Sequence, residues 1–382
     1  MTTERLNAAG QPVKPALTQI PPHMGNLADY ATLAREHMEA HAWAHLESGA
    51  DQGLTLAHNR KAFDQLRLCP EPLADLSQAH TRQNLLGQAL EWPLLLAPVA
   101  YQRLAHADGE LATARAAMAM RTGMVVSTLS SYTLEEIAQA AHTAAQELGR
   151  SGPLWFQLYQ QASREHTLSL VRRAEAAGYQ ALVWTIDAHI KRSSYPLPPG
   201  VEAANLRGMP EQRQTSDLMS EHILFGSDLA HSAPTWEDLV WLRAQTQLPL
   251  IVKGVLCASA AVKAVALGGD AIVVSNHGGR VLDGAVSPLE VLPAIRAAVP
   301  AHIPLLMDSG VRHGTDVLKA IALGASAVLV GRPQMHALAV AGMLGVAHML
   351  YLLRAELELA MAQTGCQSLE NIERNLLTTY QM

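Results

Sequence analysis

Cysteine is scarce in this chain, and its three cysteines form no cluster. Cys69, Cys257 and Cys366 are too far apart for a CxxC pair or for the spacing of a zinc site. Aromatic residues are also few, at 4% of 382 residues, so the core must be built mainly from Ala, Leu and Val. The low cysteine usage is typical of a protein in a reducing cytoplasm, and we expect no metal site.

The sequence also lacks the features of nucleic-acid-binding, secreted and membrane proteins. It has no block of Lys and Arg, and its formal net charge of −6 argues against a nucleic-acid partner. The first ten residues include charges and no apolar stretch, so a secretory signal is not expected. The longest apolar tract, residues 337–347, is too short to span a bilayer and is interrupted by Gly342 and Gly345. It predicts a buried helix and no membrane insertion.

Two common phosphate-binding fingerprints, GxGxxG and Walker A, are absent, which argues against the alternative of a doubly wound sheet. Instead, short apolar runs rich in Val, Ile and Leu alternate with Ala-rich stretches of helical spacing. Eight such units predict an α/β fold of the closed (β/α)₈ TIM-barrel type. The predicted strands are residues 93–100, 124–128, 154–159, 181–187, 248–254, 271–276, 303–308 and 325–331, and helical stretches include 110–121, 164–177, 258–267 and 315–323.

We expect a single domain over residues 1–382, with a barrel over 93–382. Residues 1–92 are expected to be an N-terminal helical extension that caps the bottom or side of the barrel. The interval between Asp187 and Leu248 is about twice the usual spacing, and a helix around 236–244 fills only part of it. The remainder, residues 188–234, predicts a long loop after the fourth strand on the catalytic face, where long loops are often lids.

Residues 275–283, Ser-Asn-His-Gly-Gly-Arg-Val-Leu-Asp, are the most informative stretch, because they place His277 and Arg280 on one loop after the sixth strand. Functional groups of such barrels lie where the strands end. A lone histidine is more often structural than catalytic, and Asp187 alone could be a helix cap. After the fourth and sixth strands, however, Asp187 and His277 can converge. A carboxylate beside an imidazole stabilises the imidazolium formed by proton abstraction.

The ends of the seventh and eighth strands favour a phosphate site. Gly310 and Arg312 follow the seventh strand, and Gly331 and Arg332 follow the eighth, where barrels commonly bind phosphate. Glycine lets backbone N–H groups approach an oxyanion, and arginine adds a bidentate positive charge. Each Gly–Arg pair is a weak signal alone, but the two together favour phosphate binding.

The ends of the third and fifth strands carry Tyr159 and Lys253, and each of these residues has two possible roles. Lys253 ends the fifth strand and is either a lysine extending from the barrel rim or a fixed cation inside the barrel mouth. Tyr159 ends the third strand and either donates a hydrogen bond to a substrate oxygen or lines the core.

With these motifs, the chain resembles the FMN-dependent L-2-hydroxy acid oxidases and dehydrogenases. This family includes glycolate oxidase, lactate oxidase and the flavin domain of flavocytochrome lactate dehydrogenase. The similarity runs from about Leu27 to about Leu369. It is carried, in the family's order, by 48–50 (SGA), 97–100 (APVA), 112–117 (ATARAA), 156–159 (FQLY), 185–187 (TID), 249–254 (PLIVKG), 275–283, 308–316 (DSGVRHGTD), 324–325 (GA) and 331–333 (GRP).

The resemblance implies an FMN cofactor and the oxidation of an (S)-2-hydroxy acid to a 2-oxo acid. It implies that His277, paired with Asp187, is the base and that Arg280 holds the substrate carboxylate. Tyr159 would contact the substrate hydroxyl, and Lys253 would lie by the flavin N1/C2 carbonyl and favour the anionic reduced ring. Ala100, Ser130, Gln157 and Thr185 would line the isoalloxazine, and Ser275, Asp308, Gly310, Arg312, Gly331 and Arg332 would hold the ribityl chain and phosphate.

The chain departs from the family pattern at two positions that touch the substrate carboxylate. The family usually has a tyrosine three residues before Ser-Gly-Ala, and here that residue is His45. The family also has a Gly-x-Arg motif shortly after the aspartate of the fourth strand. Without a gap, Ser194 takes the place of that arginine; with a two-residue deletion, Arg192 does. Because neither change is conservative, we expect an unusual or larger substrate, or one bound with pH dependence through His45.

Dioxygen is the expected electron acceptor, with hydrogen peroxide as product. Residues 188–234 lack the apolar segment that membrane-bound mandelate-type relatives carry in this loop. The alternatives are a lactate-type dehydrogenase that passes electrons to a cytochrome or quinone, and a flavin-binding protein without turnover. The resemblance also implies a homo-oligomer, usually a tetramer.

Overall fold

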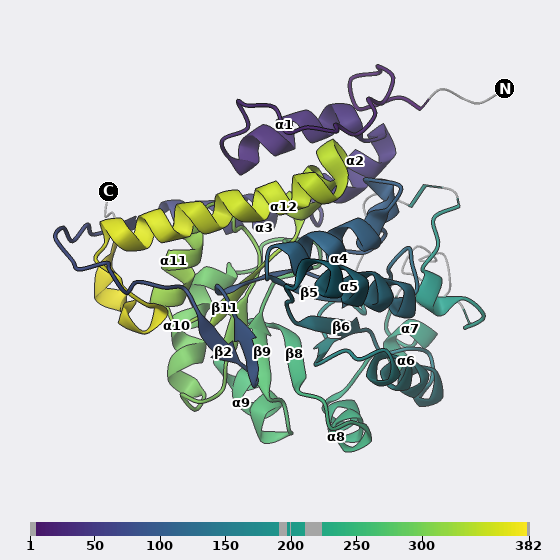
Figure 1. Cartoon of the computed structure of the whole chain (residues 1–382). Helices are drawn as coiled ribbons and strands as arrows, with labels where there is room; N and C mark the ends of the chain where they lie inside the picture. The colour runs from purple at the N-terminus through teal and green to yellow at the C-terminus, as the bar shows by residue number, and fades with distance from the viewer. Residues whose placement is uncertain (1–4, 191–196, 199, 211–223, 380–382) are drawn as a thin grey trace.

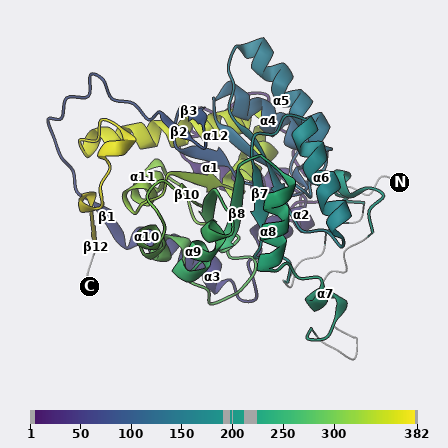
Figure 2. The same ribbon diagram turned by 90° about the horizontal axis from the view of Figure 1, so that it is seen from below.

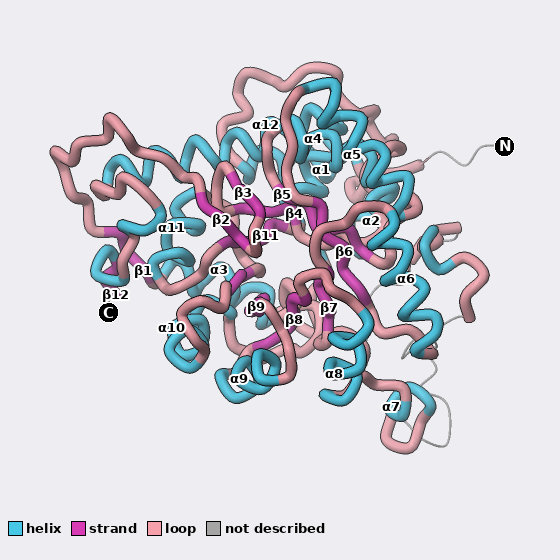
Figure 3. The backbone as a smooth tube through the Cα atoms, turned by 60° about the horizontal axis from the view of Figure 1, so that its bottom comes forward, coloured by secondary structure: helices cyan, strands magenta, loops and turns pink. Residues whose placement is uncertain are grey.

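The computed structural model describes residues 5–190, 197–198, 200–210 and 224–379. Its centre is a closed barrel of eight parallel strands in the order β10-β11-β4-β5-β6-β7-β8-β9, which confirms the predicted TIM barrel. Figure 3 shows the strands gathered at the centre with helices around them. The barrel strands are β4 (Leu94–Leu96), β5 (Gly123–Ser127), β6 (Leu154–Leu158), β7 (Leu182–Thr185), β8 (Leu250–Val255), β9 (Ala271–Val274), β10 (Leu305–Met307) and β11 (Ala327–Val330).

The barrel strands are apolar at nearly every position because both of their faces are buried. Leu95 packs with the residues that fill the barrel interior, whereas Leu94 and Leu96 pack with the residues under the helices. Successive side chains of a strand point to opposite faces, so this alternation follows from the strand itself. Most predicted strands extend past the observed ones, because residues such as Asn276 and Asp308 belong to the loops that follow, whereas β8 continues to Val255.

Helices cover the barrel where the sequence predicts them. They are α4 (Gly109–Ala119), α5 (Leu134–Leu148), α6 (Arg164–Ala176), α8 (Trp236–Gln245), α9 (Ala258–Ala266), α10 (Pro288–Ala298) and α11 (Gly314–Ala322). Helix α5 shows why a helix begins where it does. Thr133 accepts a hydrogen bond from the backbone N–H of Glu136, and the Glu136 carboxylate accepts one from the Thr133 N–H. This capping box satisfies donors that the first turn leaves without partners.

Helix α12 (Arg332–Gln363) follows the last barrel strand and contains the apolar tract predicted to be a buried helix. It is kinked at Ala341 and Gly342, where the backbone leaves helical geometry and Gly342 has φ +54°. Its length and composition would suffice to cross a membrane, but 67% of its 18-residue apolar stretch is buried inside the protein. Figure 1 shows α1 (Leu27–His37) lying along it. Burial against α1, α4 and α11 identifies α12 as a core helix.

The N-terminal segment contacts both ends of the barrel. A hairpin of β2 (Gln83–Leu85) and β3 (Gln88–Leu90) buries Leu85 and Leu90 against the barrel interior. Strand β1 (Leu66–Leu68) pairs with β12 (Leu377–Thr379), beside the barrel in Figure 2. Helices α2 (Ala40–Glu47) and α3 (Leu54–Asp64), in contrast, hydrogen bond to the loops after β9, β10 and β11. The extension therefore also reaches the catalytic end, beyond the expected cap over the bottom or side of the barrel.

The long loop after β7, the fourth barrel strand, is fastened to the barrel at Asn205. The loop contains a 3₁₀ turn (Ala204–Leu206) and the short helix α7 (Asp228–His231). The buried Asn205 amide donates to the Thr128 carbonyl (3.1 Å) and to Ser130 Oγ (2.8 Å), and its oxygen accepts from the Leu134 N–H (2.7 Å). Residues that follow β5 therefore hold the loop close to the barrel mouth. Arg192 and Ser194 lie outside the described residues.

Candidate active site

His277 lies immediately after β9 and contacts two of the groups predicted to surround it. Its Nδ1 lies 2.9 Å from Asp187 Oδ1, and its Nε2 lies 3.4 Å from Tyr159 Oη. A carboxylate at Nδ1 favours the tautomer that carries its proton there, which leaves Nε2 able to accept a proton. Burial raises the pKa of the Tyr159 phenol, and the charge of Asp187 raises it further, so the phenol stays protonated. The structure brings together the predicted base, its carboxylate partner and a hydroxyl donor.

The backbone of His277 is held in the left-handed region, with φ +58°. This conformation costs a non-glycine residue about 1 kcal/mol or more, and it requires support from its surroundings. Ser275 Oγ accepts a hydrogen bond from the His277 N–H, and Ser309 Oγ accepts one from the Gly278 N–H, both at 3.0 Å. The strained turn is thus fixed on both sides of the histidine.

Lys253 is a buried cation inside the barrel mouth rather than a lysine at the rim. It is 3% exposed, and its Nζ lies 3.2 Å from Asp308 Oδ2 and 2.9 Å from Ser275 Oγ. Burial alone would lower the pKa of Lys253, but the charges of Asp308 and Asp187 outweigh it and raise the pKa. The lysine therefore stays charged and can stabilise negative charge on a neighbouring ring.

Arg280 is anchored through one edge of its guanidinium group. Its Nη1 donates to the carbonyls of His45 (2.8 Å), Leu46 (3.1 Å) and Ser48 (3.1 Å) at the end of α2. Within the described part of the chain, Nε and Nη2 have no hydrogen-bond partner, so they can bind a carboxylate. The anchor explains how a long side chain keeps one orientation. The structure places the His45 carbonyl at this anchor, whereas the predicted contact of its imidazole with substrate stays a prediction.

Arg312 and Arg332 form the centre of the predicted phosphate site. The pKa of each guanidinium group is lowered to about 10, mainly by burial and also by a neighbouring positive charge, that of Arg332 for Arg312 and that of Arg280 for Arg332. Neighbouring buried cations of like charge repel one another unless an anion lies among them. Gly331 precedes α12 and has no side chain, so an anion can approach the backbone at the start of this helix. A phosphate fits this arrangement.

Polar atoms without partners mark the flavin side of the site. Gln157 Oε1 accepts from Ser127 Oγ and from the Thr128 N–H, both at 3.2 Å, which turns its Nε2 the other way. Gln157 Nε2 and Thr185 Oγ1 are buried at the ends of β6 and β7 and have no partner among the described residues. Buried polar groups are rarely left unpaired, so these two fit the heteroatoms of a flavin ring. Ser130 differs, because its hydroxyl already binds Asn205 and the Tyr132 carbonyl.

The other predicted cofactor residues line the same end of the barrel. Ala100 lies in the loop after β4, and Gly310 lies in the loop after β10 with φ +92°. A side chain at Gly310 would meet the Asn59 carbonyl at 2.6 Å, so only glycine fits there. Among the described residues, no group of three or more His, Cys, Asp and Glu side chains could hold a metal ion.

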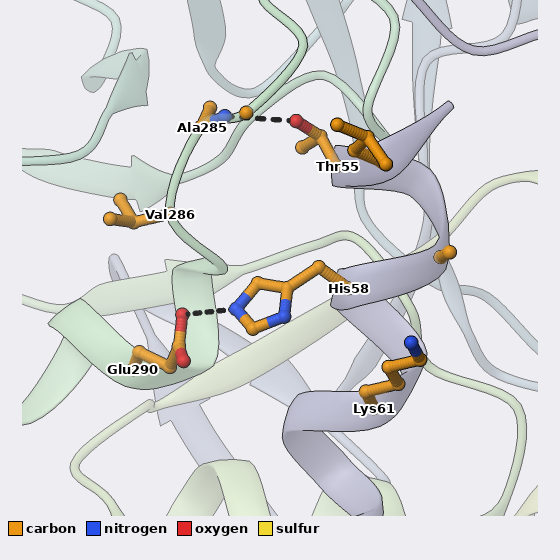
Figure 4. Close-up of a pocket in the computed structure, with 9 residues that line it drawn as sticks. Thr55, His58, Lys61, Ala285, Val286 and Glu290 are labelled. Atoms are coloured by element: carbon orange, nitrogen blue, oxygen red, sulfur yellow. Dashed lines mark hydrogen bonds and ion pairs between the residues drawn. The ribbon is translucent and has the colours of Figure 1, made fainter. Parts of the chain in front are cut away.

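Helix α3 supplies contacts that the sequence did not reveal. The Asn59 amide donates to Asn276 Oδ1 (3.0 Å) and accepts from Asn276 Nδ2 (2.6 Å), so the residue before His277 is held by a buried reciprocal pair. On the outer side of α3 lies an open pocket of ≈ 480 Å³, shown in Figure 4. There Thr55 Oγ1 accepts from the Ala285 N–H at 2.9 Å. These contacts fasten the loop that carries His277 and Arg280 to α3, and only a known partner could have revealed Asn59 from sequence.

Comparisons with known proteins agree with this geometry. A model of the family described as FMN-dependent dehydrogenase matches residues 34–379. The chain is 50% identical over 368 residues to an L-lactate oxidase of Alicycliphilus denitrificans, covering 94% of this chain and 98% of that one. It is 42% identical to a 4-hydroxymandelate oxidase of Amycolatopsis orientalis, over 90% of this chain and 95% of that one. A solved structure of mandelate oxidase superimposes with a TM-score of 0.80 at 41% identity, covering 93% and 98% of the two chains.

Proposed function

The chain belongs to the family of FMN-dependent dehydrogenases, and we propose that it is an oxidase that converts an (S)-2-hydroxy acid to the 2-oxo acid. The observation that carries this proposal is the convergence of His277, Asp187 and Arg280 at one barrel mouth. A base and a carboxylate clamp are the two groups that this substrate class requires. Several relatives with similar sequences are named as oxidases, which favours dioxygen as acceptor and hydrogen peroxide as product.

Each of the converging residues has one task in the proposed reaction. Arg280 holds the substrate carboxylate through the guanidinium edge that the protein leaves open, and Tyr159 donates to the substrate hydroxyl oxygen. His277 Nε2 accepts a proton from the substrate, and Asp187 stabilises the imidazolium that results. Bound FMN would supply the acceptor for the two electrons and the second proton that leave the substrate. Lys253 would hold a fixed positive charge beside the bound ring, where it would stabilise negative charge on that ring.

The residues of the cofactor site would hold FMN in three parts. Gln157 Nε2 and Thr185 Oγ1 would pair with polar atoms of the ring, and Ser275 and Asp308 would face the ribityl chain. The phosphate would lie at Arg312, Arg332, Gly310 and Gly331. This division follows the unpaired polar atoms at one side and the excess of positive charge at the other.

Two experiments test the function. The purified flavoprotein is mixed without oxygen with (S)-lactate, (S)-mandelate and glycolate, and loss of the visible flavin absorbance is followed; bleaching is expected with at least one acid. The reaction is then repeated in air, where hydrogen peroxide is expected. A His277→Ala variant that bleached at the wild-type rate would refute the assigned base. Bleaching without peroxide, but with reduction of a quinone or cytochrome, would identify a dehydrogenase.

We propose that His45 replaces the usual tyrosine at the substrate carboxylate, which is supported by its position three residues before Ser-Gly-Ala. His45→Phe and His45→Tyr variants should then alter the pH dependence of KM, and an unchanged profile would exclude this role. Arg192 is the proposed second arginine. A homotetramer in the cytoplasm is proposed from family resemblance. Light scattering of the purified protein tests the number of subunits.

A further inference from the structure

Two arginines that serve different ligands meet at the end of α2. The Leu46 carbonyl accepts from Arg280 Nη1 (3.1 Å) and from Arg332 Nε (3.0 Å). The Ser48 carbonyl accepts from Arg280 Nη1 (3.1 Å) and from Arg332 Nη2 (2.9 Å). Both carbonyls flank Glu47 in the chain, so the backbone of Glu47 is held against the two guanidinium groups. One short segment thus connects the proposed substrate clamp with the proposed phosphate site.

The Glu47 carboxylate is fixed beside this cluster. Its Oε1 lies 2.8 Å from Nε2 of His336, a residue of α12 that is 3% exposed and stacks on Trp43 with ring centroids 5.5 Å apart. Burial alone would raise the pKa of Glu47, but the hydrogen bond from His336 and the charges of Arg332 and Arg312 lower it. Glu47 is therefore an anion at neutral pH, and its orientation is set by a buried neighbour.

Glu47 is also the common negative neighbour of the whole arginine cluster. Its charge raises the pKa of Arg280, of Arg312 and of Arg332, in each case against the larger effect of burial. In the described part of the chain, no other carboxylate acts in this way on all three arginines. Three guanidinium groups and one carboxylate leave an excess of positive charge, which a phosphate dianion can neutralise.

We propose that Glu47 is a resident counter-charge for Arg280, Arg312 and Arg332, which stabilises the cluster before FMN binds and weakens the hold on the FMN phosphate. The inference rests on the proposed function, because it places the phosphate at Arg312 and Arg332. Glu47 and the phosphate are both negative and attract the same cations, so they repel each other across the cluster. Removing the Glu47 charge should therefore have opposite effects on the two states of the protein.

The test uses the full chain, stripped of flavin and titrated with FMN or with riboflavin, which has no phosphate. Glu47→Gln keeps the shape and can still pair with His336. We expect Glu47→Gln to bind FMN about threefold to tenfold more tightly than wild type, because the Glu47 side chain is 36% exposed and solvent screens part of its repulsion of the phosphate. Riboflavin affinity should not change. The flavin-free variant should melt at a lower temperature than flavin-free wild type, because three cations lose their counter-charge.

A matched control separates this effect from a general change of charge. Glu147→Gln removes an exposed carboxylate from the last turn of α5 and should leave the FMN affinity and the flavin-free melting temperature unchanged. Glu47→Ala should shift FMN affinity in the same direction as Glu47→Gln, which keeps the test decisive if one variant folds poorly. Unchanged or weaker FMN binding by both variants overturns the inference, as does an equal change for FMN and riboflavin. Failure of wild type to bind FMN would instead overturn the proposed function.

Discussion

Replacement of Arg280 by methionine is the sharpest test of how the site recognises its substrate. Methionine keeps part of the apolar stem and removes every donor. In the structure, Nη1 is committed to three backbone carbonyls at 2.8–3.1 Å, so the substrate can use only Nε and Nη2. Two charge-assisted hydrogen bonds to a carboxylate are worth about 3–4 kcal/mol together, since each contributes about 1.5–3 kcal/mol and the two share one ion pair. The expected loss of kcat/KM is about 10²–10³-fold.

The assay compares an (S)-2-hydroxy acid with its methyl ester, which keeps the reacting carbon and lacks the negative charge. Wild type should strongly prefer the acid, and Arg280→Met should lose most of this preference because the rate with the ester falls much less. Arg280→Lys should lie close to Arg280→Met, because a single ammonium nitrogen cannot bind the α2 carbonyls and a carboxylate together. Equal losses for acid and ester would show that Arg280 does not bind the carboxylate. Arg115→Met, which removes an exposed arginine of α4, is the control and should change neither rate.

Three further predictions concern stability in the flavin-free chain. Lys253→Met or Asp308→Asn alone should lower the free energy of unfolding, measured in urea, by about 3–5 kcal/mol, because each single change leaves a buried charge unpaired. The double variant should lose clearly less than the sum of the two single losses. His277→Gly should be about 0.5–1 kcal/mol more stable than His277→Ala, because glycine adopts φ +58° without strain; equal stabilities would refute that strain. The ion pair with Glu356, 3.6 Å from His313 Nδ1 to Glu356 Oε2, raises the pKa of His313, so their pairing should stabilise the fold below about pH 6.5 and fade as pH rises through the folded pKa. Because both groups are partly exposed, Glu356→Gln should lower the free energy of unfolding by no more than about 1 kcal/mol at about pH 5.5. At about pH 9, where His313 is neutral, loss of this ion pair should not change the free energy of unfolding.

The barrel was predictable because its signal is local. Continuous apolar runs at regular intervals specify strands buried on both faces, and the polar residue after each run, such as Lys253 or Asp187, then falls at the same end of the barrel. The pair His277–Asp187 follows from that rule without knowledge of side-chain geometry, whereas the pair Lys253–Asp308 was found only in the structure. The ends of the strands were less predictable. The residues up to Asn276 continue the strand-like run in the sequence, but β9 ends at Val274, and the Asn276 side chain accepts a hydrogen bond from the Gly279 N–H in the loop that follows.

The contributions of Asn59 and Glu47 in the N-terminal segment were not predictable in the same way. Asn59 and Glu47 stand on short helices whose sequence carries no mark of the loop they contact, and the information lies in a partner more than two hundred residues away. The reciprocal amide pair of Asn59 and Asn276 depends on the relative placement of two elements, which periodicity does not encode. The identity of the acid could not be predicted from sequence for a related reason: His45 departs from the family pattern, and Arg192, the other position concerned, lies outside the described residues.

The separation in sequence between α2, α3 and the loop after β9 also constrains the order in which the protein can fold. Asn59 is 217 residues from Asn276, and the His45 carbonyl is 235 residues from the guanidinium group that it anchors. Contacts of such high sequence separation form late, because the entropy of closing the chain between them must be lost first. During synthesis, the residues that orient the base and the clamp emerge long before the loop they support. The substrate clamp can therefore form only after most of the barrel exists, and catalytic competence should be among the last properties that the folding chain acquires.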